Sequence, residues 1–288
     1  MIERKSDRTF YIINYLILAV IGLATLYPFI NILAVSLSNP GQVAAGNVTL
    51  FPKEFTDVAY QQVINNPRFW NALKISIFVT IVGTIISVSI VALAAYPASK
   101  KELPFRTPLM LFFIIVMLFS GGIVPNFILV RAIGLYNTRM ALVLPSALQV
   151  YHMLLIKNYL ETLPVELEES AKIDGATNIQ ILTKILIPLS LPVLASVSLF
   201  TAVIYWNNYF NALLYVSNTN LQPLPYYVYQ LIQYYSAPII DNPELAAKLD
   251  KNTIQAATII ASTIPILLVY PFLQRYFVKG IVVGSVKG

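Results

Sequence analysis

The sequence predicts an all-α integral membrane protein, and three observations support this fold class. Hydrophobic residues make up 57% of the 288 residues and charged residues only 11%, far from the composition of soluble domains. The mean hydropathy is +0.71. Six apolar stretches are each long enough to cross about 30 Å of hydrocarbon, and none shows the period-two alternation of a barrel strand. Because lipid offers the backbone no hydrogen-bond partner, we expect these stretches to be helices.

The six predicted transmembrane helices belong to one domain, residues 1–288. They cover residues 11–37, 72–97, 107–129, 139–157, 190–214 and 253–277. The first follows a basic start, as a secretory signal does, but its uncharged run is longer than the roughly 7–15 residues of a signal core. We therefore expect an uncleaved first span.

Lysine and arginine are unevenly divided between the two sides of this bundle. Twelve lie in the two termini and in the loops at 100–106 and 157–189, whereas seven lie in the longer loops on the other side. By the positive-inside rule, both termini and the loop 158–189 face the cytoplasm.

Several kinds of chemistry are disfavoured by composition. The chain has no cysteine and one histidine, so we predict neither a catalytic site nor a metal site. The spans are nearly free of charge, whereas ion-driven transporters hold titratable residues at mid-membrane. No G-x-x-x-x-G-K-[ST] phosphate loop occurs, so the chain is not expected to bind ATP by that device.

The loop 158–189 is the exception to this apolar composition. Its acidic first half is predicted to form a short helix beginning near Thr162 and Pro164, and Asp174-Gly175 is a break signal. A second helix is predicted from apolar residues at helical spacing: Ile179, Leu182, Ile185 and Leu186. Five acidic residues outnumber three basic ones between residues 157 and 189, so nucleic acid is an unlikely partner. Two interpretations remain open: docking on a basic groove of another protein, or a solvated loop helix.

The spacing within this loop resembles a known family. Glu169-Ser170-Ala171, three residues, Gly175, nine residues and Ile185-x-Ile187-Pro188 are similar to the E-A-A-x3-G-x9-I-x-L-P loop of membrane subunits of ATP-binding-cassette importers. Four other stretches resemble the carbohydrate importers that include the maltose transporter: LFPKEFT at 50–56, VPNFILVRAIGLYNTRMALVLP at 124–145, YWNNYF at 205–210 and QRYFVKGIVVGSVKG at 274–288.

This resemblance implies a translocation subunit of an ATP-driven sugar or oligosaccharide importer in a bacterial cytoplasmic membrane. Such a subunit is half of a pore, is not itself an enzyme and works by alternating access. The implied partners are a second, homologous membrane subunit, an extracytoplasmic sugar-binding protein and two ATPase subunits, which carry the ATP and magnesium. The sugar is not identified, although the resemblance leans towards oligosaccharides such as pectin fragments. The alternative is a self-sufficient secondary transporter or channel.

The resemblance also implies two sets of site residues. A coupling helix between spans 4 and 5 would contact the ATPase, with Glu169 pairing with basic residues and Gly175 allowing close backbone approach. The coupling set is Glu168, Glu169, Ser170, Ala171, Asp174, Gly175, Ile185 and Pro188. The substrate-path set is Tyr205, Trp206, Asn207, Asn208 and Asn211. For these asparagines, sugar contact and hydrogen bonding between helices both remain open. The family commonly has an acidic residue where this chain has Asn208.

Overall fold

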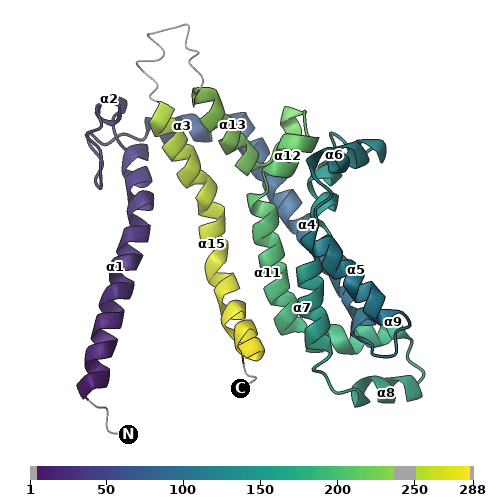
Figure 1. Cartoon of the computed structure of the whole chain (residues 1–288). Coiled ribbons are helices and arrows are strands. Elements are labelled where there is room, and N and C mark those ends of the chain that lie inside the picture. Colours follow the sequence, from purple (N-terminus) through teal and green to yellow (C-terminus); the bar gives the residue numbers. More distant parts are fainter. Residues whose placement is uncertain (1–4, 237–250, 286–288) are drawn as a thin grey trace. The chain divides into compact units, whose positions relative to one another are not determined.

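The computed structural model describes the backbone of residues 5–236 and 251–285 and the side chains of residues 10–233 and 251–269. The regular structure of these residues is helical throughout, which confirms the all-α prediction (Figure 1). They form two compact units, residues 5–69 with 228–236 and 251–264, and residues 70–227 with 265–285. The side chains of the C-terminal stretch 274–288, which carries part of the family resemblance, lie outside the described residues.

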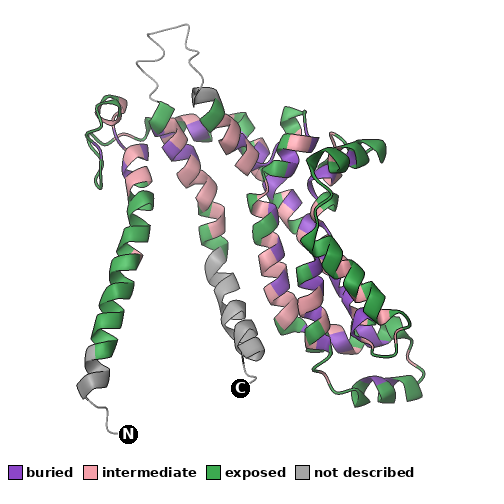
Figure 2. Cartoon of the chain, viewed as in Figure 1, coloured by how far each residue is buried: buried purple, intermediate pink, exposed green. Residues whose placement is uncertain are grey.

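The first unit contains a long apolar helix and a short connecting segment. Helix α1 (Lys5–Ser36) leads through α2 (Pro40–Ala44) to α3 (Val58–Ile64). Most of the described part of α1 is exposed within the chain (Figure 2), although its side chains are large and apolar. Exposed apolar side chains along a whole helix suit a lipid environment. At its end, the Ser36 and Tyr60 hydroxyls lie 2.8 Å apart and tie α1 to α3.

The second unit holds most of the helices. They are α4 (Pro67–Ser99), α5 (Arg106–Leu118), α6 (Ile123–Ala132), η1 (Arg139–Leu142), η2 (Leu144–Ser146), α7 (Val150–Leu160), α8 (Glu166–Ile173), α9 (Asn178–Ile181), η3 (Leu182–Leu186), α10 (Ile187–Leu189), α11 (Leu191–Asn207), α12 (Phe210–Tyr215) and η4 (Thr219–Leu221). Helices α13 (Leu224–Ser236) and α15 (Lys251–Ser285) each have residues in both units.

Three apolar clusters form the core of the second unit, and the smallest consists of Val130, Ala141 and Tyr215. The first joins α4, α7 and α11 to the elements after α8, through fully buried side chains such as Met153, Ile181 and Val197. The second lies towards the opposite end of α4 and includes Ile75, Leu142 and Tyr205. Helix α7 packs beside both α5 and α11. These contacts place the predicted coupling loop at one end of a packed helix group and α12 at the other, as Figure 1 shows.

Three pairs of consecutive helical segments, within or beside the predicted spans, are sharply bent. Helices α5 and α6 meet at 109°, the η1–η2 segment meets α7 at 53°, and the α9–α10 segment meets α11 at 83°. In the described residues, three helices are long and apolar enough to cross a membrane, or up to six if each bent pair is one span. The six-span topology therefore stays a prediction.

The breaks have local causes that hydropathy does not reveal. Phe119 is extended and Gly122 has φ +87°, so the third predicted span turns between them. The fifth ends at Asn207, because Asn208 is extended, and α12 is a separate short helix. The predicted spans 107–129 and 190–214 are thus each divided between two helices in the structure.

Candidate functional site

The predicted short acidic helix is present as α8. It begins at Glu166 and places three carboxylates in its first turn, where the helix dipole favours negative charge. Thr162 does not start this helix, contrary to the prediction. Its hydroxyl instead donates to the Tyr159 carbonyl, at 2.7 Å, and so closes the end of α7. Val165 occupies the N-cap position without a side-chain bond, so α8 depends on its other contacts for its position.

The predicted break at Asp174-Gly175 is also present. The amide of Gly175 donates to the Lys172 carbonyl at 3.0 Å, and the amide of Ala176 donates to the Ala171 carbonyl at 2.9 Å. These two bonds form a Schellman motif, which requires a left-handed residue between them. Gly175 supplies it with φ +80°, and a Cβ there would meet no heavy atom within 4 Å. Within the chain, the glycine is needed for its backbone conformation and not for close packing.

The segment after the break returns the chain to the helix core. Thr177 and Gln180 form a capping box that starts α9, and a π-helical turn, η3, follows. Leu182 and Leu186 are buried in the first core cluster and Ile185 packs against it, as the predicted apolar face requires. Ile179 was assigned to the same face, but it is 72% exposed. Pro188 is exposed and lies in α10.

The acidic residues of the loop fall into two groups. Glu168, a member of the predicted coupling set, is only 8% exposed and accepts a bond from the Lys100 ammonium group, so it faces inward. Glu161 accepts from both Arg106 and Lys157. The other three acidic residues are exposed and take part in no ion pair among the described residues: Glu166, Glu169 and Asp174.

Exposed apolar residues accompany these free carboxylates. Val165 is 58% exposed and Ile173 is 86% exposed, and both lie on the same short segment as Glu169. We call the surface made by six exposed residues the loop face: Val165, Glu166, Glu169, Ile173, Asp174 and Ile179. Ser170 is exposed beside it, whereas Ala171 is buried beneath it. The motif did not indicate the exposed isoleucines, although large apolar residues beside a turn could have suggested them.

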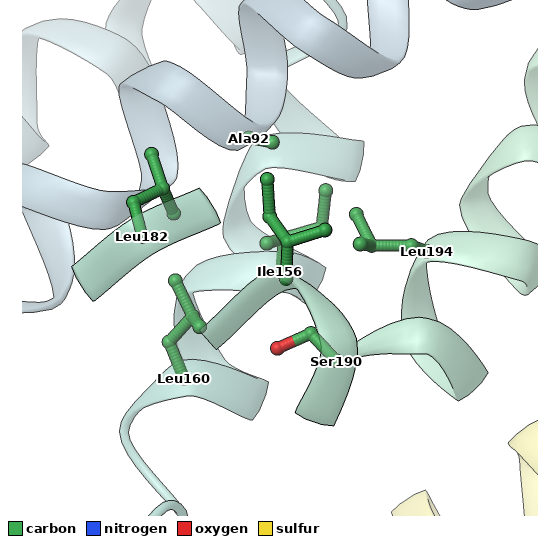
Figure 3. A pocket seen from close by; sticks show the side chains of 7 residues that line it. Ala92, Ile156, Leu160, Leu182, Ser190 and Leu194 are labelled. Carbon is green, nitrogen blue, oxygen red and sulfur yellow. The ribbon is translucent and has the colours of Figure 1, made fainter. Parts of the chain in front are cut away.

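A small cavity lies beneath the loop, between α7, η3 and α11 (Figure 3). Its lining is Ala92, Ile156, Leu160, Leu182, Ile187, Ser190 and Leu194. The Ser190 hydroxyl is buried and has no hydrogen-bond partner within the described part of the chain. The space holds about one water molecule, so it is too small for a sugar.

The residues predicted for the substrate path are divided between internal and exposed positions. The Tyr205 hydroxyl donates to the Val143 carbonyl at 2.9 Å, and the Asn211 amide donates to the Ser146 hydroxyl at 3.0 Å. Both side chains are therefore held inside the unit. Asn207 is exposed, and its amide donates to the Val203 carbonyl one turn earlier at 2.9 Å. Asn208 accepts from the backbone of Asn211, and Trp206 is half-buried.

Cations without carboxylate partners lie at this same end of the second unit. Arg131 lies over the Tyr136 ring at 6.0 Å and Arg139 over the Phe78 ring at 5.2 Å. Neither arginine is in an ion pair among the described residues. All six carboxylates between residues 70 and 227 belong to the stretch 102–174, on the predicted cytoplasmic side. The opposite end is therefore cationic.

Comparison with known proteins agrees with this architecture. The profile of the family described as "Binding-protein-dependent transport system inner membrane component" matches residues 78–283. The "Polygalacturonan/rhamnogalacturonan transport system permease protein YtcP" of Bacillus subtilis (strain 168) is 38% identical over 98% of this chain and 100% of its own. "Protein LplC" of the same strain is 40% identical over 100% of this chain and 98% of its own.

A solved structure shares the fold. It is a chain of a bacterial ABC transporter involved in the import of the acidic polysaccharide alginate, with a TM-score of 0.87 and 32% identity. The match covers 96% of this chain and 99% of that one. The chain therefore belongs to the family of inner membrane components of binding-protein-dependent transport systems.

Proposed function

We propose that this chain is the translocation subunit of an ATP-driven oligosaccharide importer and that the loop face is where an ATPase subunit docks. The observation that carries the proposal is that α8 and its two flanking residues expose apolar side chains and three carboxylates that form no ion pair among the described residues, on a loop joined to the packed bundle. Carboxylates that form no ion pair within the chain can pair with a basic groove on another protein. The exposed isoleucines would be buried when that protein binds.

In this proposal the chain forms half of a pore with a second membrane subunit. Two ATPase subunits supply the energy, because the chain has no phosphate loop of its own. Closing of the ATPases around ATP moves the loop face, and hydrolysis returns it, so that the pore opens to one side of the membrane at a time. A binding protein delivers the solute from outside, as the family's description indicates.

We further propose that the solute is an anionic oligosaccharide. Two similar proteins support this class, since one is named for polygalacturonan and rhamnogalacturonan and the other belongs to an importer of alginate, an acidic polysaccharide. The cationic outer end of the second unit supports it independently. Arg131 and Arg139 lie there although the positive-inside rule disfavours cations on this side, and neither forms an ion pair among the described residues. Such a field attracts anionic solutes.

A charge reversal tests the docking surface. Glu169→Lys should place like charges against a basic groove and weaken ATPase attachment by about tenfold or more. The matched control is Glu102→Lys, the same change at an exposed site on the same predicted side but outside the loop face. Copurification of the ATPase and sugar uptake should fall for the first variant and not for the second. Equal attachment in both variants would contradict the docking assignment.

A further inference from the structure

Two sets of ion pairs lie around the loop, one between α8 and the end of α4 and one at the end of α7. Lys100 pairs with Glu168, while Glu161 pairs with both Arg106, at 2.5 Å, and Lys157, at 2.9 Å. The side chains of Lys157 and Glu168 are only 13% and 10% exposed. Pairs at this depth are less screened by water and salt than pairs on an open surface.

Two of the cations come from the turn between α4 and α5. Lys100 directly follows the last residue of α4, and its ammonium group lies 4.7 Å from the centre of the Tyr96 ring. Arg106 begins α5, and its Nε donates to the Ala98 carbonyl at 3.2 Å. Both cations are thus held against the end of α4. From there, one reaches Glu168 on α8 and the other reaches Glu161 at the end of α7.

Helix α8 has little else to hold it. Only Glu168 and Ala171 of its eight residues are buried. An alanine side chain buries a small apolar area, and hydrophobic stabilisation is roughly proportional to that area. The other residues of α8 are exposed, and several of them belong to the loop face, where we propose that the ATPase binds. The Lys100–Glu168 pair is therefore the main side-chain connection between α8 and α4.

We infer that the Lys100–Glu168 pair is a latch that makes α4 follow α8 when α8 is displaced, with Arg106 and Glu161 holding the end of α7 in the same assembly. Lys100 and Glu168 are positioning residues, and this role rests on the proposed function. Without the lysine, Glu168 would be a buried carboxylate lacking its counter-charge, which is costly enough that the side chain would turn to water. Helix α8 could then still bind an ATPase while its movement would no longer reach α4.

The test uses the complete importer reconstituted in vesicles and measures sugar uptake per ATP hydrolysed. Lys100→Glu and Glu168→Lys should each lower this ratio by about tenfold, because each puts two like charges in a half-buried contact. The ATPase should remain attached in both variants. The double variant, which exchanges the two charges, should recover most of the ratio. Lys101→Glu is the matched control, since Lys101 is the next residue and is exposed.

A second measurement is needed because the double variant with exchanged charges could fail to recover through poor packing alone. The chain has no cysteine, so Lys100→Cys with Glu168→Cys offers two unique thiols for a short bis-maleimide. The cross-linked protein should regain the uptake ratio that the uncross-linked double variant lacks. Wild-type uptake ratios in the single charge variants would overturn the latch, and so would a low ratio in both the exchanged and the cross-linked proteins.

The attachment of the ATPase separates the latch from direct docking. Loss of ATPase attachment in Glu168→Lys, with normal attachment in Lys100→Glu, would show that Glu168 itself contacts the ATPase and would overturn the latch. The Glu169→Lys result decides the docking proposal separately.

Discussion

The ring of Tyr205 on α11 lies directly against the backbone of Gly83 on α4. A Cβ atom at position 83 would come within 2.8 Å of ring carbons, closer than real contacts allow. The ring has no freedom to move away, because Tyr205 is 2% exposed and its hydroxyl bonds to the Val143 carbonyl. Small residues allow such close approach between helices in membranes. Gly83 therefore sets how closely α4 and α11 pack.

This contact predicts the effect of adding one methyl group. Gly83→Ala should destabilise the protein by about 1–3 kcal/mol, the usual cost of overpacking a filled core. Gly22→Ala is the matched control, because Gly22 is also helical and a Cβ there meets nothing within 4 Å. Thermal unfolding of the detergent-purified variants measures the difference. Equal midpoints would show that Tyr205 relaxes without cost.

Gly175 is predicted to be replaceable by asparagine but not by valine. Its φ of +80° is strained for a β-branched residue, whereas asparagine adopts the left-handed region more readily. Gly175→Val should misdirect α9, lower ATPase copurification and abolish uptake, and Gly175→Asn should retain most of both. A Cβ atom here meets no heavy atom within 4 Å in the isolated chain, so the backbone conformation is the constraint that separates the two substitutions. Failure of both variants would mean that the docked partner presses on this backbone.

The two asparagines Asn207 and Asn211 should respond differently to alanine. Asn211→Ala removes the bond to the Ser146 hydroxyl, and we expect a loss of about 0.5–1.5 kcal/mol in stability. Asn207 is exposed, so Asn207→Ala should leave the unfolding midpoint unchanged and lower uptake if the side chain meets the solute. Unfolding and transport measured on the same preparations separate the two roles. A destabilised Asn207→Ala variant with normal uptake would reverse this assignment.

The proposed solute class predicts dependence on sugar carboxylates. An oligogalacturonate should be transported faster than the same oligomer after reduction of its carboxyl groups. Arg131→Gln with Arg139→Gln should weaken that preference, because it removes two guanidinium groups that form no ion pair among the described residues. Raising the ionic strength should weaken the preference in the unmodified protein, since salt screens exposed charges. Faster transport of the reduced oligomer would contradict an anionic solute.

Much of this architecture can be predicted from the sequence because it depends on residues that are close together in the chain. Composition and apolar length identify a helical membrane protein. The Asp174-Gly175 pair predicts the break because the turn is closed by bonds within six residues, from Ala171 to Ala176. The bend at Gly122 was missed although glycines are present in the sequence. An apolar run gives the same hydropathy whether its helix is straight or broken, so the left-handed conformation of Gly122 that turns the chain does not appear in the hydropathy.

The sequence by itself determined that a short acidic helix interrupts an apolar bundle and that a glycine ends it. Only the tertiary structure decided which of its carboxylates faces the protein. Glu168 and Glu169 are neighbours with the same chemistry, so nothing local distinguishes them. Their roles depend on the rotation of α8, which places Glu168 against Lys100, 68 residues earlier in the chain, and leaves Glu169 exposed. A contact over that distance exists only once α4 and α7 have packed together, because their packing brings the two charges into reach.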